Sequence, residues 1–225
     1  MAGPLQSPNR RVLIAAASGL LLSPHAAAAA AAARLSGRMK TVVMLGDSIT
    51  AGLGLPASAS LPVQLQAALR QAGVSARVVG AGVSGDTSAD GLARVDFSVP
   101  TDVDLCVVEL GGNDLLQGAK PEATARNLTQ IIRRLRARGI NVVLTGVSAP
   151  ASIGRGYAHE FDAVFRDIAK REEVILLPDL LEGVTNTPTL KQADGLHPNA
   201  RGVQVIVARL APVVARGLAQ PSVRP

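Results

Sequence analysis

The sequence is poor in aromatic residues. It contains no tryptophan, one tyrosine and three phenylalanines, so aromatic side chains make up 2% of its 225 residues. Proteins that hold single-stranded nucleic acid rely on aromatic side chains that stack on the bases. This scarcity argues against that class of function, and it predicts a hydrophobic core built from aliphatic side chains.

Cysteine and histidine are also scarce. The single cysteine, Cys106, excludes an intrachain disulfide and any cysteine-rich metal site. It lies in an apolar run, where a free cysteine usually packs as a small hydrophobic side chain. The three histidines are isolated from one another, without the spacing of metal ligands. We therefore expect neither a metal nor an organic cofactor.

The charged residues are few and dispersed. They make up 18% of the chain against 48% hydrophobic residues, which is enough for a sizeable core and argues against disorder. The formal net charge of +6 comes from Lys and Arg residues that stand singly rather than in runs. This pattern favours a solvated basic surface over a patch for an acidic partner. The length predicts one domain, or at most two.

Residues 1–33 have the order of an export signal. The pair Arg10-Arg11 precedes an apolar run over 12–22, and an alanine tract ending at Ala33 offers several Ala-x-Ala cleavage sites. The run is too short to cross a bilayer, and the paired arginines resemble a twin-arginine signal. We expect cleavage of this segment, leaving one domain of residues 34–225 that is periplasmic or secreted. The alternative is a helical extension that stays attached.

In the rest of the chain, apolar runs typical of strands alternate with amphipathic stretches typical of helices. Nearly unbroken apolar strands are typical of a parallel sheet covered on both faces. The expected fold class is therefore α/β, a three-layer sandwich around a central, mostly parallel five-stranded sheet. Ser60 is expected to cap the first helix. Strands are predicted at 41–45, 76–79, 103–110, 141–147 and 174–177, and helices at 61–71, 88–95, 121–138, 158–171 and from Asn199 onward.

Four polar stretches follow the predicted strands or come late in the chain. They are Gly46-Asp47-Ser48, Gly85-Asp86, Gly111-Gly112-Asn113-Asp114 and Asp194-Gly195-Leu196-His197-Pro198. The carboxyl ends of parallel strands meet at one edge of a sheet, and ligands bind there. The topology therefore brings a hydroxyl, a glycine amide, a carboxamide and an Asp/His pair to one rim. These are the groups that acyl transfer needs.

A serine hydroxyl is a weak nucleophile at neutral pH and needs a base within hydrogen-bond reach. His197 is the candidate base for Ser48, because His159 falls within a helical pattern and His25 belongs to the predicted signal. The base needs an acceptor on its other ring nitrogen, which Asp194 can supply by folding back in a turn. Taken alone, Asp194 and His197 also fit an ordinary surface loop.

The oxyanion of an acyl-transfer intermediate needs preorganised donors. Gly85 can present its backbone N–H at close range, Asn113 can present its side-chain amide, and the Ser48 backbone N–H would be the third donor. Each stretch taken alone is also ordinary turn composition. Asp47 and Asp114 are expected to cap or brace these turns rather than react. Glu109, at the end of an apolar strand, is expected to be a structural hydrogen-bond partner rather than a base.

Together and in order, these stretches resemble the four sequence blocks of the SGNH, or GDSL-type, hydrolases. The likeness covers essentially the whole mature chain and is greatest to the bacterial group of periplasmic arylesterases, acyl-CoA thioesterase I and lysophospholipases. It implies a flavodoxin-like SGNH hydrolase fold and hydrolysis of acyl esters or thioesters through an acyl-enzyme. Carried over by position, it implies a catalytic triad of Ser48, Asp194 and His197, and an oxyanion hole of Ser48, Gly85 and Asn113.

Two other functions compete with hydrolysis. Gly80-x-Gly82-x-x-Gly85 fits a dinucleotide-binding fingerprint, although it follows the second strand rather than the first. The same fold could also hold acyl chains or glycans without turnover. For a hydrolase we expect a small-molecule ester or thioester as partner, no nucleic acid and no stable membrane insertion. Acyl chain length and leaving group depend on the loops 51–60, 115–120 and 149–155.

Overall fold

The structure is a computed structural model that describes residues 1, 3, 38–149 and 153–222. The predicted export signal lies outside the described residues apart from Met1 and Gly3. The fold is that of the compact unit Met39–Pro225.

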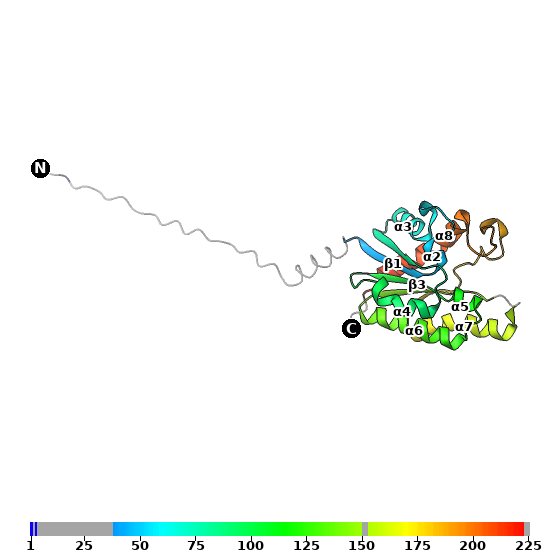
Figure 1. The fold of residues 1–225 in the computed structure, drawn as a ribbon. Helices are drawn as coiled ribbons and strands as arrows, with labels where there is room; N and C mark the ends of the chain where they lie inside the picture. Colours follow the sequence, from blue (N-terminus) through cyan, green and yellow to red (C-terminus); the bar gives the residue numbers. More distant parts are fainter. Residues whose placement is uncertain (2, 4–37, 150–152, 223–225) are drawn as a thin grey trace. The chain divides into compact units, whose positions relative to one another are not determined.

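This unit is built on a five-stranded sheet whose strands are all parallel (Figure 1). The spatial order β2-β1-β3-β4-β5 confirms the predicted α/β class with a central parallel sheet. The strands are β1 (Lys40–Gly46), β2 (Ala76–Gly82), β3 (Leu105–Glu109), β4 (Asn141–Thr145) and β5 (Ile175–Leu177).

Helices cover both faces of the sheet and complete the predicted three layers (Figure 1). One face carries α3 (Leu61–Gln71) and α8 (Ala200–Ala219), which pack against each other. The other face carries α4 (Ser88–Ser98), α6 (Pro121–Ala137) and α7 (Arg155–Arg171). The described residues also form the short helices α2 (Ser48–Ala51) and α5 (Gly112–Leu116) and the 3₁₀ turns η1 (Ala57–Ala59) and η3 (Pro188–Leu190).

The central strand β1 shows why the sheet is buried on both sides. Successive side chains of a strand point to opposite faces. Val42 and Met44 pack in the core under α3 and α8, whereas Val43 and Leu45 pack in the core under α4, α6 and α7. Cys106 on β3 is fully buried in the second core, and burial raises its thiol pKa to about 12. This cysteine therefore packs as a small hydrophobic side chain, as predicted.

Among the described residues, α8 is the one helix whose length and mean hydropathy would suit a membrane span. It begins after Asn199, whose side chain accepts hydrogen bonds from the backbone of Arg201 and Gly202 and so caps the helix as predicted. The apolar side chains of α8, such as Ile206 and Leu210, are fully buried in the core. Their burial in the domain accounts for the hydropathy of the helix.

Strand β2 continues to Gly82, beyond the predicted end at Val79. Its glycines pair with β1, Gly80 beside Met44 and Gly82 beside Gly46. A side chain at position 82 would collide with the backbone of α2, so the glycine permits the close packing of these two elements. The dinucleotide-binding interpretation was wrong, because two of its three glycines lie inside a strand rather than in a phosphate-binding turn.

Two details of the helices differ from prediction. Helix α4 begins at Ser88 as expected but runs to Ser98 rather than Val95. Ser60 occupies the N-cap position of α3, yet its hydroxyl donates to the carbonyl of Ala57 at 2.8 Å instead of capping the helix. The turn η1 places that carbonyl within reach. The other predicted elements begin and end within three residues of the observed bounds.

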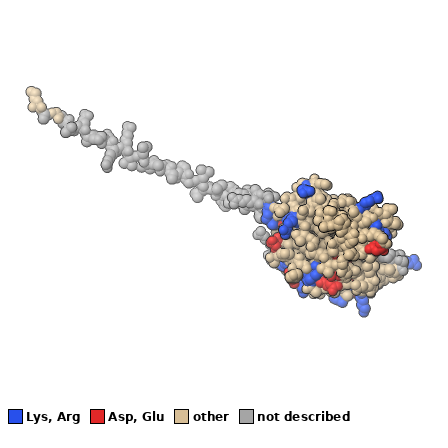
Figure 2. Space-filling model, turned by 45° about the horizontal axis from the view of Figure 1, so that its top comes forward, with Lys and Arg blue, Asp and Glu red and all other residues tan. Residues whose placement is uncertain are grey.

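The face of the molecule in Figure 2 agrees with the expectation of dispersed charge. In Figure 2, Lys and Arg side chains stand apart from one another and are interspersed with Asp and Glu. Some charged side chains of the described residues pair across helices, as Arg134 and Asp96 do between α6 and α4. The face shown therefore carries no continuous basic patch.

Candidate active site

The site lies where the strand order reverses. Strand β1 has β2 on one side and β3 on the other, so the chain leaves β1 and β3 toward different layers and a crevice opens at their carboxyl ends. A cavity of about 380 Å³ occupies this crevice. It is lined by four of the five residues predicted for the site, Ser48, Gly85, Asn113 and His197, and the fifth, Asp194, lies against the histidine.

Ser48 is the first residue of α2, directly after β1. The Asp47 side chain caps this short helix by accepting a hydrogen bond from the Ile49 backbone at 3.0 Å. Because Ser48 begins the helix, its own N–H has no carbonyl partner within it. The residue is 8% exposed, so its hydroxyl is largely shielded from water but faces the cavity.

His197 lies in the loop before α8 and bonds at both ring nitrogens. Its Nε2 is 2.8 Å from the Ser48 hydroxyl and its Nδ1 is 2.7 Å from Oδ2 of Asp194. A carboxylate next to Nδ1 requires the proton on that nitrogen, which leaves the lone pair of Nε2 facing the hydroxyl. In this tautomer the imidazole can accept the proton of Ser48.

Asp194 holds its own loop in shape. Its Oδ1 accepts from the backbone N–H groups of Leu196 and His197, at 2.9 and 3.0 Å. The bond from Leu196, followed by the bond from the His197 ring, lowers the pKa of Asp194 to about 2. The carboxylate therefore stays ionised throughout the range in which a histidine titrates, and it can stabilise a positive imidazolium.

Gln192 fixes the histidine loop to the rest of the site. Its backbone N–H donates to the carbonyl of His197 at 2.8 Å, and its side chain donates to the carbonyls of Leu53 and Pro198. Leu53 belongs to the loop that follows Ser48. The Gln192 side chain thus bonds to both the loop that follows Ser48 and the loop that carries His197.

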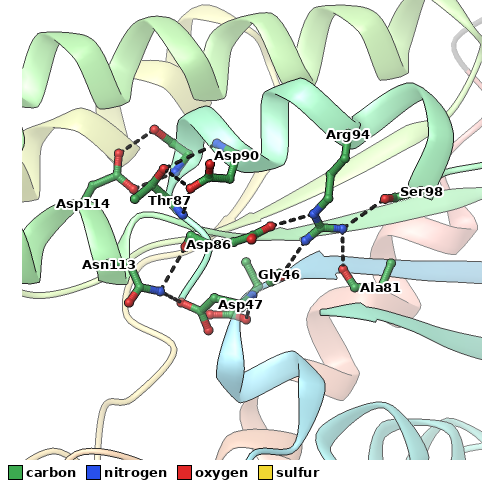
Figure 3. Close-up of polar contacts among 12 residues, drawn as sticks. Gly46, Asp47, Ala81, Asp86, Thr87, Asp90, Arg94, Ser98, Asn113 and Asp114 are labelled. Atoms are coloured by element: carbon green, nitrogen blue, oxygen red, sulfur yellow. Dashed lines mark hydrogen bonds and ion pairs between the residues drawn. The ribbon is translucent and has the colours of Figure 1, made fainter. Parts of the chain in front are cut away.

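Gly85 and Asn113 approach the serine from the two neighbouring strands. Gly85 follows β2 with a φ of +89°, a left-handed conformation that favours glycine, and the space where a side chain would stand is open. Asn113 is the second residue of α5, after β3. Its Nδ2 donates to the carbonyl of Asp86 at 2.9 Å and to Oδ2 of Asp47 at 3.1 Å (Figure 3). Both N–H bonds of this amide are engaged.

A buried carboxyl group lies beneath the serine turn. Glu109 accepts hydrogen bonds from the Thr50 hydroxyl at 2.8 Å and from the Asp47 backbone at 3.3 Å. Burial, followed by the charge of Asp47, raises the pKa of Glu109 well above its ordinary value, and burial also raises the pKa of Asp47. Glu109 is therefore a structural hydrogen-bond partner, as predicted.

Asp114 braces the short helix α5, which also carries Asn113. It accepts from the backbone N–H and hydroxyl of Ser88, at 2.7 and 2.5 Å, and from the Thr124 hydroxyl at 2.9 Å. These bonds tie α5 to α4 and α6. The bracing roles predicted for Asp47 and Asp114 agree with these contacts.

The cavity walls are mainly apolar. They come in part from the loops expected to shape the site, which contribute Leu53 and Leu116. Leu181 and Thr185, which follow β5, also line the cavity and were not predicted, because that segment has no motif or periodicity that marks it. The full apolar lining is Leu53, Leu115, Leu116, Val147, Leu181 and Leu196, with Ile49 beside the serine.

One charged side chain near the site also escaped sequence reasoning. Arg94 on α4 bonds to the carboxylate of Asp86 and to the carbonyl of Gly46 (Figure 3). The signal that could have found it is its place on the helix, because Arg94 shares a face with Gly91 and Val95, which are buried. A charged residue on a core-facing stripe needs buried partners.

Of the two histidines that the structure describes, His159 lies outside this cavity. It is exposed on α7, within a helix as predicted. Within the described ranges, no group of three or more His, Cys, Asp or Glu residues is placed to hold a metal ion.

The chain is similar to known acyl hydrolases in family model, sequence and structure. Residues 44–205 match the model of the GDSL-like Lipase/Acylhydrolase family. The chain is 41% identical over 160 residues to Esterase TesA of Pseudomonas aeruginosa, covering 71% of this chain and 80% of that protein. It is 39% identical over 169 residues to Thioesterase 1/protease 1/lysophospholipase L1 of Escherichia coli K12, covering 75% and 79%. The crystal structure of TesA superposes with a TM-score of 0.75 at 38% identity, covering 79% of this chain and 99% of that one.

Proposed function

Because this chain belongs to the GDSL-like lipase/acylhydrolase family and is an esterase of that family, we propose that it hydrolyses acyl esters and thioesters through an acyl-enzyme formed on Ser48. The observation that carries this proposal is the line of hydrogen bonds from Asp194 through His197 to Ser48, which ends in an apolar-walled cavity. No cofactor takes part in the proposed chemistry.

In the acylation step, Oγ of Ser48 attacks the carbonyl carbon of the substrate while its proton passes to Nε2 of His197. Asp194 keeps the proton on Nδ1 and stabilises the imidazolium that forms. When the tetrahedral intermediate collapses, His197 gives its proton to the leaving alcohol or thiol. The acyl group remains on Ser48 as an ester.

The negative oxygen of the intermediate is proposed to accept hydrogen bonds from the N–H groups of Ser48 and Gly85 and from Nδ2 of Asn113. The Asn113 amide is already held by Asp47 and Asp86. Its longer bond, 3.1 Å to Asp47, is the one that would be shared with the oxyanion. Deacylation repeats the sequence with a water molecule, which loses its proton to His197 and releases the carboxylic acid.

The acyl chain is proposed to lie along the apolar walls of the cavity, because removal of apolar groups from water favours its binding there. The name of the Escherichia coli relative covers thioester and lysophospholipid cleavage, so both kinds of substrate are candidates for this chain. A panel of aryl esters and acyl thioesters of increasing chain length identifies the preferred acyl group and leaving group.

Export and cleavage are part of the proposal. Residues 1–33 carry the arginine pair, apolar run and Ala-x-Ala sites of an export signal, and the mature protein is proposed to be a single domain of residues 34–225 in the periplasm or outside the cell. The amino-terminal sequence of protein recovered from the periplasmic fraction tests this. Uncleaved protein confined to the cytoplasm would overturn it.

The experiment that tests the mechanism compares the wild-type chain with Ser48→Ala and His197→Ala on a chromogenic short-chain ester. Each substitution is expected to lower kcat by on the order of 10⁴-fold or more. Retained affinity for a non-hydrolysable acyl analogue in Ser48→Ala would show that the fold is intact. Turnover at the wild-type rate in Ser48→Ala, or binding without turnover in the wild type, would sink the mechanism.

A further inference from the structure

Arg94 on α4 reaches the ends of two strands and the loop between β2 and α4 (Figure 3). Its Nη2 donates to the carbonyl of Gly46 at 2.8 Å, its Nη1 to the carbonyl of Ala81 at 2.8 Å, and its Nε to the carboxylate of Asp86 at 2.6 Å. Nη1 also donates to the hydroxyl of Ser98, one turn along the helix, at 3.1 Å. One guanidinium thus joins α4, β1, β2 and the loop.

The contacts of Arg94 need the shape of a guanidinium. The side chain is 19% exposed and that of Asp86 is 11% exposed, so water screens this pair only weakly. A guanidinium presents its donors in a rigid planar fork, whereas a lysine ammonium is a point charge on a flexible stem. A lysine at position 94 can keep the charge near Asp86, but its three donors on one nitrogen cannot reproduce the four bonds that Arg94 makes from three separate nitrogens.

Two of the three acceptors of Arg94 outside its own helix, Gly46 and Asp86, stand next to the proposed oxyanion donors. Gly46 precedes the turn that presents Ser48, and Asp86 directly follows Gly85. The carbonyl of Asp86 in turn accepts the bond from Nδ2 of Asn113. Ser48 and Gly85 are therefore connected to residues bonded by the guanidinium through one or two peptide units. Asn113 is connected to Asp86 through one hydrogen bond.

We propose that Arg94 is a positioning residue for the reaction, which sets the spacing between the serine turn and the Gly85-Asp86 loop so that the oxyanion donors converge on one point. This inference rests on the proposed function, because it assigns Arg94 a role through the proposed donors. The guanidinium does not touch the substrate in this account. It acts through Asp86 and the carbonyl of Gly46.

A positioning role predicts a specific kinetic pattern. Misplacement of oxyanion donors raises the energy of the tetrahedral transition state more than that of the bound ester. Arg94→Lys should therefore lower kcat by roughly 10- to 100-fold and leave KM within about threefold, as expected for a displacement on the scale of an ångström. Asp86→Asn, which keeps the backbone carbonyl but weakens the anchor, should lower kcat in the same direction.

The inhibition constant of an alkyl boronic acid is a quantity that a purely structural role of Arg94 would leave unchanged. The boronic acid forms a tetrahedral adduct with a serine hydroxyl whose oxygen occupies the oxyanion position, and so resembles the transition state. Across wild type, Arg94→Lys and Asp86→Asn, the inhibition constant should rise in proportion to the fall in kcat/KM. Rates are expressed per active site titrated with a fluorophosphonate, so that any unfolded fraction does not enter.

The matched control is Arg134→Gln. Arg134 also pairs with an acidic residue of α4, Asp96 at 3.1 Å, but on the exposed side of the helix and away from the loop. This variant should keep the wild-type kcat and boronate affinity. The double variant Arg94→Lys/Asn113→Ala should lose less than the product of the two single losses, because both changes act on the same donors.

The possible outcomes distinguish failure of the positioning role of Arg94 from failure of the proposed Ser48 mechanism. An unchanged kcat and boronate affinity in Arg94→Lys, or a lower kcat without weaker boronate binding, would overturn the positioning role. Strictly multiplicative losses in the double variant would overturn it as well. Persistent turnover in Ser48→Ala would instead overturn the proposed mechanism, whatever Arg94→Lys does.

Discussion

Gly46 on β1 and Glu109 on β3 are direct neighbours across the sheet, and the Glu109 carboxyl fills the space that a side chain at position 46 would need. A β carbon on Gly46 would lie 2.5 Å from Oε2 of Glu109 and would also collide with the Thr50 hydroxyl. The glycine that precedes Asp47-Ser48 is thus required by packing. It lets a buried acid support the turn that carries the serine.

Substitution Gly46→Ala tests this packing. The extra methyl group must displace Glu109 or Thr50, so we expect a loss of about 1–3 kcal/mol in the free energy of unfolding together with a lower kcat. Urea denaturation measures the first quantity. Gly156→Ala is the matched control, because Gly156 lies in helix α7 with open space around it and alanine is favoured in helices. Equal stability of Gly46→Ala and wild type would contradict the account.

Glu109→Gln tests the protonation of the buried acid. A carboxyl whose pKa is raised in the folded state binds its proton more tightly there than in the unfolded chain, so its contribution to stability falls as pH rises above its ordinary pKa of 4.5. Relative to Glu109→Gln, the wild type should lose up to about 1.4 kcal/mol per pH unit above that value, until the pH reaches the folded-state pKa. Urea denaturation at several pH values measures the difference.

Glu172→Gln is the control of opposite sign. Arg133 lowers the pKa of Glu172, so this group stabilises the folded state above its ordinary pKa, and the contribution is lost as pH falls. As pH rises, the wild type should therefore gain stability relative to Glu172→Gln but lose stability relative to Glu109→Gln. Near pH 4.5 and below, the Glu109 difference should stop changing, because the acid is then protonated in both states. A Glu109→Gln difference that does not change with pH would mean that the acid is ionised in the folded protein.

Asn113→Ala tests the side-chain oxyanion donor. Loss of this amide should lower kcat by roughly 10²- to 10³-fold with little change in KM. Asn127→Ala removes another half-buried amide, which donates to the Ser88 hydroxyl behind the site at 3.0 Å, and should leave kcat near the wild-type value. Steady-state kinetics on one aryl ester suffices. Similar losses in both variants would point to general disturbance of the loops.

Leu181 tests the assignment of the acyl pocket. Leu181→Ala enlarges the cavity wall and should shift the preferred ester toward longer acyl chains, with changes in kcat/KM of roughly 10-fold at the extremes of the panel. Leu181→Phe should shift the preference toward shorter chains. Val63→Ala, a truncation on the exposed face of α3, should leave the profile unchanged. If both Leu181 variants kept the wild-type chain-length profile, the acyl chain would have to bind away from Leu181.

Much of this architecture follows from local sequence patterns. The apolar run before Ser48 forms a buried strand, the helix at 61–71 has the predicted bounds, and the strand ends bring Ser48, Gly85 and Asn113 to one cavity because all strands are parallel. Such features depend on periodicity and turn chemistry, which are readable from neighbouring residues.

Other features depend on contacts between distant residues and could not be read in this way. Gly80 and Gly82 resemble a turn, but they form a strand because β1 and α2 pack closely against them. The engagement of Asn113 by Asp47 depends on how two strand ends face each other. The role inferred for Arg94 depends on the spatial meeting of Gly46 and Asp86, which are 40 positions apart.

The central claim is that Ser48 carries the acyl group. The most direct test is mass spectrometry of the protein after treatment with a dialkyl aryl phosphate, which phosphorylates a serine activated by a neighbouring base. We predict one adduct per chain, located on the peptide that contains Ser48, with loss of esterase activity in proportion to labelling and no adduct in Ser48→Ala. Loss of activity with the adduct on another residue, or full activity in a protein labelled at Ser48, would contradict the account.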